Sequence, residues 1–184
     1  KNQAQVFKTY VQKFASEQLD LELKGADRIE LFKDGKLWST LYFLGTNANT
    51  AQSYHGHLYV DEVFWIPGYD KLQKVASGMA SHKKWRRTYF STPSSLQHPA
   101  YPHWSGEKYN KNRSKKVDFD LSDTTLSQGS LGPDRIWRHK VTVHDAEDMG
   151  CRLLDIAELN EEYSKADFEN LFGCKFIDDA DSLF

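Results

Sequence analysis

The sequence predicts an α/β fold with a mostly parallel sheet, an added antiparallel β piece and helices toward the C-terminal end. Two short apolar segments, 58–60 and 87–91, have the character of buried strands. About 24 residues separate them and contain one predicted helix, 70–80. This strand–helix–strand spacing is typical of a right-handed crossover between two parallel strands.

The N-terminal third predicts a helix followed by a hairpin. Apolar side chains recur at helical spacing within residues 2–19. A strand at 28–32, a turn at 33–36 and a second strand at 37–44 then predict two antiparallel strands. Residues 45–56 are rich in Asn, Thr and Gln and predict a polar loop.

The composition shifts near residue 116, which predicts two parts, 1–116 and 117–184. In the first part, the remaining elements are a loop with Pro and aromatic residues and a short helix, at 99–104 and 104–112. In the second part we expect a strand, a loop, a longer strand and two helices, at 117–121, 127–134, 135–143, 155–163 and 164–172. Ser164 and Asp167 resemble a capping box at the start of the last helix.

The bulk composition indicates a globular chain. At 184 residues, with 39% apolar and 14% aromatic residues, it is large enough for a hydrophobic core. It contains neither an 18-residue apolar run nor the apolar stretch of a signal peptide. The two cysteines, Cys151 and Cys174, favour a reducing compartment and are expected to be small core side chains.

Two consecutive carboxylates follow the first predicted parallel strand. Asp61 and Glu62 stand where the strand 58–60 should end. This is the pattern of a Walker B element, in which the first carboxylate holds hydrated Mg²⁺ and the second polarises the water that attacks the γ-phosphate. The alternative is an edge strand that happens to end in acidic residues.

Two hydroxyls follow the second predicted parallel strand. Ser91 and Thr92 precede Pro93, which should end the strand. Ligands of open α/β sheets bind outside the carboxyl ends of the strands, so these hydroxyls are placed to sense a γ-phosphate. The alternative is an ordinary turn built from Ser and Thr.

Positive charge is concentrated in residues 1–116, which hold 18 Lys/Arg against 10 Asp/Glu, whereas residues 117–184 hold 6 against 16. A basic half suggests contact with nucleic acid, while the acidic half is expected to be solvated helix faces. The candidate DNA-binding residues form two clusters. The first basic cluster, which flanks Trp85, comprises Lys83, Lys84, Arg86 and Arg87. The second basic cluster comprises Lys111, Arg113, Lys115 and Lys116, with Lys108 beside it. For each cluster, a solvated surface is the alternative.

An ordered set of segments resembles one protein family. The segments are 2–7, 42–47, 52–56, 58–62, 74–80, 89–94, 101–106 and 168–172. Together they resemble the ATPase half of the large terminase subunit of tailed double-stranded DNA bacteriophages. The resemblance covers nearly the whole chain, and the order of the segments is more specific than any one of them.

The resemblance implies a function for the parent protein. Members of that family use ATP and Mg²⁺ to package viral double-stranded DNA into a capsid in the host cytoplasm, and cut it with a separate nuclease domain. It implies that Asp61 binds Mg²⁺, that Glu62 is the general base and that Ser91 and Thr92 sense nucleotide. It further implies a coupling loop containing Asn47, Asn49 and Gln52. The implied partners are DNA, the capsid portal and the small terminase subunit, and no membrane.

The sequence contains no Gly-x-x-x-x-Gly-Lys-Ser/Thr phosphate loop. In the resembled family that loop precedes the part matched here and the nuclease domain follows it. We therefore expect an incomplete P-loop NTPase core, a segment of a longer chain that binds no ATP by itself. The alternatives are part of a helicase-like ATPase core, or a non-catalytic DNA- or capsid-docking relic of a prophage gene. A metal site at His55 and His57 is disfavoured, because no second ligand pair stands at suitable spacing.

Overall fold

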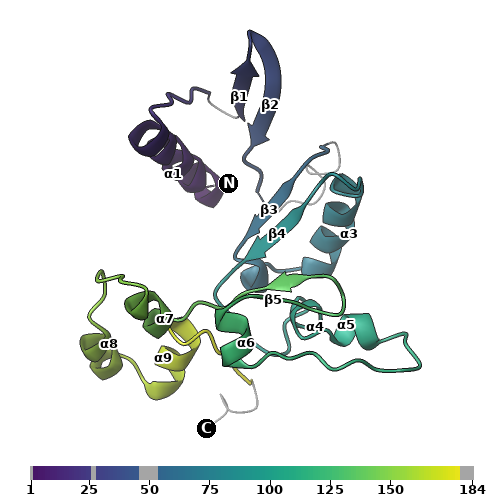
Figure 1. The fold of residues 1–184 in the computed structure, drawn as a ribbon, viewed down its shortest axis with the longest axis vertical. Helices are drawn as coiled ribbons and strands as arrows, with labels where there is room; N and C mark the ends of the chain where they lie inside the picture. The colour runs from purple at the N-terminus through teal and green to yellow at the C-terminus, as the bar shows by residue number, and fades with distance from the viewer. Residues whose placement is uncertain (1, 26–27, 46–53, 179–184) are drawn as a thin grey trace.

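The computed structural model describes residues 2–25, 28–45 and 54–178, and it has α/β architecture (Figure 1). Its strands are β1 (Arg28–Lys33), β2 (Lys36–Tyr42), β3 (Leu58–Asp61), β4 (Arg87–Phe90), β5 (Ser130–Leu131) and β6 (Trp137–Arg138). Its longer helices are α1 (Asn2–Leu19) and α3 (Tyr69–Met79). The shorter ones are η1 (Val63–Trp65), α4 (Tyr101–Trp104), α5 (Glu107–Asn110), α6 (Asp123–Ser127), α7 (Val143–Asp148), α8 (Ile156–Glu162) and α9 (Lys165–Leu171).

The parallel pair β3–β4 lies at the middle of the molecule, with α3 beside it (Figure 1). The register pairs Leu58 with Arg87 and Asp61 with Phe90, so both strands end at the same edge. The predicted strands, the crossover helix and their parallel arrangement are therefore confirmed. Apolar side chains of β3, of the crossover and of the residue before α4 form the central core, which contains Val60, Val63, Ile66, Tyr69 and Ala100.

The predicted helix and hairpin at the N-terminal end are also confirmed. β1 and β2 are antiparallel, and the turn between them places Asp34 and Gly35 at φ 52° and 74°. Positive φ at both central residues is what a type I′ hairpin turn requires, and Asp-Gly is a favoured pair for it. Ile29 of β1 is completely buried, whereas Trp38 of β2 is 69% exposed.

The C-terminal helices begin at residues whose side chains cap them. Asp155 accepts a hydrogen bond from the Glu158 N–H, and Ser164 accepts one from Asp167. These caps satisfy backbone donors that have no partner inside a helix. They explain why the two predicted helices, 155–163 and 164–172, appear as α8 and α9. None of the helices in the described ranges is long and apolar enough to cross a membrane.

The prediction of a mostly parallel sheet is wrong for the described residues. They form three separate two-stranded sheets, and only β3–β4 is parallel. The predicted strand 117–121 is also absent: at its first residue, the Asn110 side chain binds both the N–H and the C=O of Val117, the groups that a neighbouring strand would use.

The predicted strand 135–143 is reduced to the two residues of β6, and helix α7 was missed. Thr142 and Asp145 form a capping box, in which each side chain binds the backbone N–H of the other residue. This box starts a helix at Val143, in a stretch whose apolar residues resemble a strand.

Two predicted loops contain regular structure. Residues 99–104 include α4, whose second residue is Pro102, a position where the missing proline N–H costs nothing. Residues 127–134 include β5, which pairs with β6. Both are short elements that tertiary contacts stabilise.

Arg138 of β6 forms a buried ion pair and also connects β6 to α4. Arg138 and Asp134 have side chains that are 3% and 6% exposed, and Arg138 donates to both carboxylate oxygens, at 2.6 and 2.9 Å. Arg138 also donates to the backbone carbonyls of His103, Trp104 and Ile136. Five hydrogen bonds thus use the guanidinium, which is how a charge is tolerated inside a protein.

Candidate functional site

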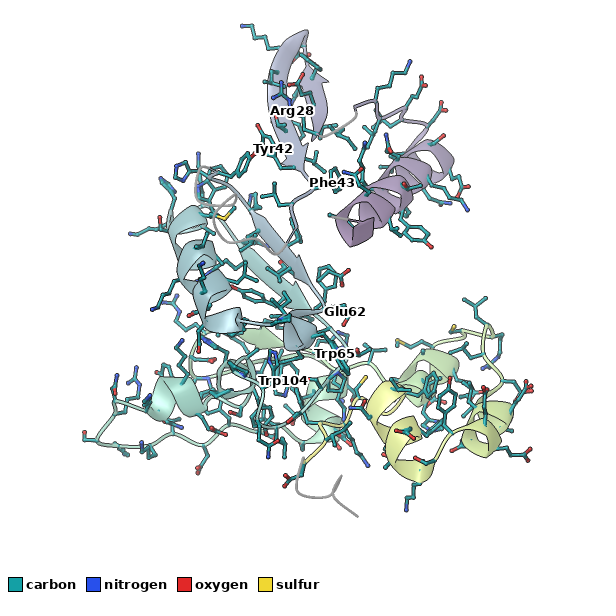
Figure 2. All side chains as sticks on the ribbon, turned by 180° about the vertical axis from the view of Figure 1, so that it is seen from behind. Arg28, Tyr42, Phe43, Glu62, Trp65 and Trp104 are labelled. Atoms are coloured by element: carbon teal, nitrogen blue, oxygen red, sulfur yellow. The ribbon has the colours of Figure 1, made fainter. Side chains whose placement is uncertain are left out.

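Glu62 stands directly after β3 with a left-handed backbone, φ 51° and ψ 45°. A non-glycine residue in this conformation is strained by about 1–3 kcal/mol, and such strain is concentrated at functional sites. It ends the strand, starts η1 and turns the Glu62 side chain toward the end of β4. Glu62 and the neighbouring Trp65 are marked in Figure 2.

The Glu62 carboxylate binds the two predicted sensing residues. Its Oε2 accepts from Ser91 Oγ at 3.0 Å, from the Thr92 N–H at 3.3 Å and from Thr92 Oγ1 at 3.4 Å. Ser91 Oγ also lies 2.6 Å from the Thr92 carbonyl oxygen. Because a serine hydroxyl has one hydrogen, Ser91 can donate to only one of these acceptors at a time. The structure therefore brings together Glu62, Ser91 and Thr92 as the sequence predicted.

Trp65 braces Thr92, which sequence reasoning missed. The indole Nε1–H of Trp65 lies 2.9 Å from Thr92 Oγ1 and 3.2 Å from the Thr92 carbonyl oxygen. Since Thr92 Oγ1 accepts from Trp65, its own hydrogen remains available for Glu62. Ser94 adds a second brace by donating to the Phe64 carbonyl at 2.5 Å. The sequence places Trp65 three residues after Glu62, but it gives no signal that Trp65 hydrogen-bonds to Thr92, 27 residues later.

Asp61 is the last residue of β3, and its side chain is exposed. Within the described ranges no residue hydrogen-bonds to it or forms an ion pair with it. No group of three or more His, Cys, Asp or Glu within these ranges could hold a metal by itself. Mg²⁺ usually takes one or two protein carboxylates and completes its shell with waters and substrate phosphates, and an exposed Asp61 fits that donor set.

The predicted coupling-loop residues Asn47, Asn49 and Gln52 lie outside the described residues. His57, next to that loop, has a structural contact. Its Nδ1 accepts from the Arg86 N–H at 3.1 Å, and its ring stands edge-on to Trp85 at 5.2 Å.

The first basic cluster lies on the turn between α3 and β4 and at the start of β4, and all four of its residues are exposed. Lys84 Nζ lies 4.3 Å from the centre of the Trp85 ring. Arg87 donates to Ser77 Oγ at 3.2 Å, so it is partly held by α3. The Trp85 ring contacts Lys84 and His57 within the chain, so stacking on a base would compete with these contacts.

The second basic cluster lies in the irregular segment after α5, where all four residues are exposed. Arg113 stacks on Tyr109 at 3.8 Å, and Lys116 donates to the Asn110 carbonyl. Lys108 is held by His103 Nε2 at 2.8 Å. Burial, followed by the positive charge of Lys108, lowers the pKa of His103 to about 4, so this imidazole is neutral at pH 7.

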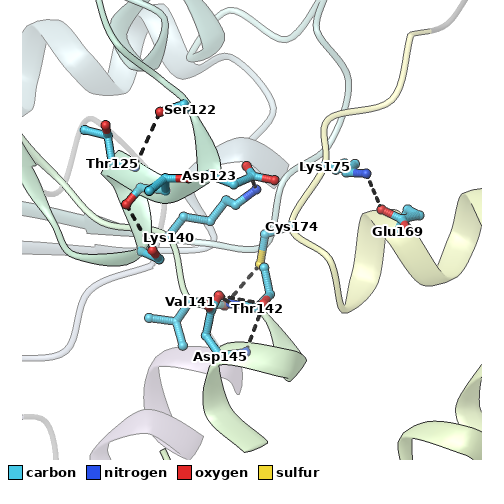
Figure 3. A network of polar contacts seen from close by, with 12 residues as sticks. Ser122, Asp123, Thr125, Lys140, Val141, Thr142, Asp145, Glu169, Cys174 and Lys175 are labelled. Carbon is cyan, nitrogen blue, oxygen red and sulfur yellow. Dashed lines mark hydrogen bonds and ion pairs between the residues drawn. The ribbon is translucent and has the colours of Figure 1, made fainter. Parts of the chain in front are cut away.

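A cavity of about 360 Å³ lies between the hydroxyl pair and the C-terminal helices. Ser91 and Thr92 form one wall, and Val143, Phe172 and Cys174 belong to the other. Figure 3 shows Cys174 directed at the Val141 carbonyl, beside the capping box of α7. Burial raises the pKa of Cys174, which keeps this thiol protonated at neutral pH. Cys151 is exposed, so its predicted place in the core is wrong.

The site is thus a strained glutamate after a parallel strand, held by two hydroxyls from the next strand. Over residues 1–184 the chain matches the family model described as terminase large subunit, T4likevirus-type, N-terminal. The chain belongs to the large terminase subunit family.

Two relatives match along the full length of the chain. It is 51% identical over 187 residues to the protein named "Terminase, ATPase subunit" of Escherichia phage P2, and covers 31% of that protein. It is 43% identical over 187 residues to "Probable terminase, ATPase subunit" of Haemophilus phage HP1, and covers 30% of it. The chain therefore spans less than a third of either relative. No solved structure matches it. Membership of this family sets aside the helicase-like alternative.

Proposed function

We propose that this chain carries the hydrolytic residues of a viral DNA-packaging motor. In the longer parent protein, ATP hydrolysis would be coupled to movement of double-stranded DNA into the capsid. The observation that supports this proposal is the contact of Glu62 with Ser91 and Thr92 at the carboxyl ends of two parallel strands. The names of both relatives, "Terminase, ATPase subunit" and "Probable terminase, ATPase subunit", agree with this proposal.

Glu62 is the proposed general base. A carboxylate at this position accepts a proton from the attacking water and orients it toward the γ-phosphate. In the present structure Oε2 is engaged by three donors, whereas no described residue donates to Oε1, so a water can bind at Oε1 or replace one of the donors at Oε2. Because Ser91 can turn its hydrogen to the Thr92 carbonyl, it can release Glu62 without losing a hydrogen bond.

Asp61 is the proposed ligand of the magnesium ion, which bridges nucleotide phosphates and neutralises their charge when bound. Its exposure and its lack of partners among the described residues leave it available for this role. Ser91 and Thr92 are the proposed nucleotide-sensing pair, because any displacement of Glu62 changes their hydrogen bonds directly. The core of the parent would then be of the P-loop NTPase type.

The two basic clusters are the proposed contacts with DNA phosphates, since their residues are exposed. The proposed protein partners are the portal of the capsid and the small terminase subunit, and the place of action is the cytoplasm of the bacterial host. Asn47, Asn49 and Gln52 are proposed to couple the nucleotide site to DNA.

The test uses the full-length parent protein. Glu62→Gln should retain nucleotide binding and lose hydrolysis by about 100-fold or more, because the amide keeps the shape but cannot accept the proton. Asp61→Ala should instead weaken Mg²⁺-dependent nucleotide binding. Glu161→Gln is the matched control, because this glutamate is exposed on α8, and it should hydrolyse ATP at the wild-type rate. Near wild-type hydrolysis by Glu62→Gln would show that Glu62 is structural.

A further inference from the structure

The chain that follows the hydroxyl pair is fastened to the C-terminal end of the described structure. Asn170 of α9 donates from Nδ2 to the Pro93 carbonyl at 3.1 Å and to the Lys175 carbonyl at 2.7 Å. The Ile177 N–H donates to the Ser94 carbonyl, and the Ile177 carbonyl accepts from Leu96, both at 2.9 Å. The segment that begins one residue after Thr92 is therefore held by residues more than 70 positions further along the chain.

Asn170 is the only side chain in the described part of the protein that hydrogen-bonds to the Pro93 carbonyl. It is 4% exposed, and both hydrogens of its amide have an acceptor. Its burial has a cost that only satisfied hydrogen bonds offset, so the amide is firmly fixed in place. Replacing it with an apolar residue would leave two carbonyls without their donor.

The Pro93 carbonyl is closely connected to the groups that bind Glu62. The proline ring fixes φ of Pro93, and it also restricts Thr92 to an extended backbone. Only ψ of Pro93 remains soft between the Thr92 peptide and the Pro93 carbonyl. A displacement of that carbonyl that rotation about this single torsion cannot absorb therefore moves Thr92, whose N–H and hydroxyl donate to Glu62.

On its other side the hydroxyl pair borders the cavity of about 360 Å³ rather than packed side chains. In a closely packed core, neighbouring side chains hold a segment in place, and the loss of one hydrogen bond moves it little. Here Ser91 and Thr92 face open volume toward Val143 and Phe172. On this side their position is therefore fixed by hydrogen bonds, from Trp65 to Thr92 and from Asn170 to the Pro93 carbonyl, rather than by close packing.

We propose that Asn170 is a positioning residue that sets Ser91 and Thr92 relative to Glu62 by holding the Pro93 carbonyl. This inference rests on the function proposed above for Glu62. It gives a role to the segment 168–172, which contains Asn170 but none of the proposed hydrolytic residues. The hydrogen bond from Asn170 to Pro93 also connects helix α9 to the proposed nucleotide site.

The test compares Asn170→Ala with Asn160→Ala in the full-length parent. Asn160 is the matched control because it is exposed on α8 and its amide binds only the Ile156 carbonyl of the same helix. Asn170→Ala should lower kcat for ATP by about tenfold, because small displacements of catalytic groups are costly, while KM for ATP stays within about twofold. Asn160→Ala should leave both constants unchanged.

A spectroscopic measurement separates positioning from a merely structural role. Trp65 donates to Thr92, so the ¹⁹F resonance of 5-fluorotryptophan at position 65 reports where Thr92 lies. Its signal is assigned by its loss in Trp65→Phe. Asn170→Ala should shift this resonance and Asn160→Ala should not. If Asn170→Ala does not fold, Asn170→Ser, which retains one donor, is judged by the same criteria and should show a smaller effect of the same kind.

Glu62→Gln, measured in parallel, distinguishes an error in the proposed function from an error in the proposed role of Asn170. If Glu62→Gln still hydrolyses ATP, the proposed function is wrong. If Glu62→Gln is inactive while the folded Asn170 variant keeps the wild-type kcat and an unshifted Trp65 resonance, the function stands and the positioning role of Asn170 is wrong.

Discussion

Removing the charge of Arg138 should destabilise the fold more than any exposed charge change in the chain. Arg138→Met keeps the aliphatic length but removes the donors to Asp134, His103 and Trp104. The Asp134 carboxylate is then left 6% exposed without its partner. Breaking a buried ion pair at one end typically costs about 3–5 kcal/mol, a large part of the 5–15 kcal/mol that stabilises a typical domain.

The free energy of unfolding from urea denaturation measures this effect. Arg152→Met is the matched control, because the Arg152 side chain is 71% exposed and its ion pair with Glu147 is 3.8 Å long. That control should change stability by less than about 1 kcal/mol. Equal, small losses for Arg138→Met and Arg152→Met would refute the reasoning that the Arg138 pair supports the core.

The same ion pair has a pH signature. Burial by itself would raise the pKa of Asp134, but hydrogen bonds from Arg138 and from the Ile136 N–H outweigh it, and the pKa is lowered. A carboxyl with a lowered pKa stabilises the folded state above the ordinary Asp pKa, and this contribution is lost as the pH falls through the folded-state value. Arg138→Met should therefore remove part of the acid sensitivity of the wild-type chain.

Three other outcomes are expected. The chain of 184 residues alone should hydrolyse ATP no faster than background, because its sequence holds no phosphate loop; turnover of about 1 s⁻¹ that Glu62→Gln abolishes would contradict this. Changing all four residues of the first basic cluster to Ala should lower the slope of log affinity for duplex DNA against log salt, by roughly 0.9 per lost phosphate contact; equal slopes would mean a solvated surface. His103, whose pKa is about 4, should make unfolding easier as the pH falls from about 6.5 toward 4, since the unfolded imidazole binds a proton first; a denaturation series with His103→Gln that matches wild type at every pH would disprove it.

Local sequence signals predicted the central parallel strands and the side chains that meet at their ends. The strands predicted at 58–60 and 87–91 followed from short apolar runs and end within one residue of the observed ends at Asp61 and Phe90, and the single helix between them predicted a parallel crossover. Glu62, Ser91 and Thr92 could be placed together because parallel strands end at one edge. The left-handed backbone of Glu62 could not be foreseen, because it follows from the turn into η1 rather than from a glycine.

Long-range polar contacts are what the sequence failed to reveal. Nothing local to Asn170 indicates that its amide binds a carbonyl 77 residues earlier. The strand predicted over 135–143 failed for a different, local reason. Val141 and Val143 have strand-like character, but the capping box of Thr142 and Asp145 decides for a helix. At the start of the predicted strand 117–121, the Asn110 side chain occupies both backbone groups of Val117 that a neighbouring strand would use.

The separation between Pro93 and Asn170 has a consequence for synthesis of the protein on the ribosome. Glu62 can meet Ser91 and Thr92 once residue 92 is free, because these partners lie within 30 residues of each other. The attachment of the next segment, residues 93–96, to Asn170 and Ile177 must wait until a further 85 residues are made, which takes roughly 4–17 s at about 5–20 residues per second. During this interval Glu62 can contact Ser91 and Thr92 in the nascent chain, but the hydrogen bonds from Asn170 and Ile177 to the following residues are still missing.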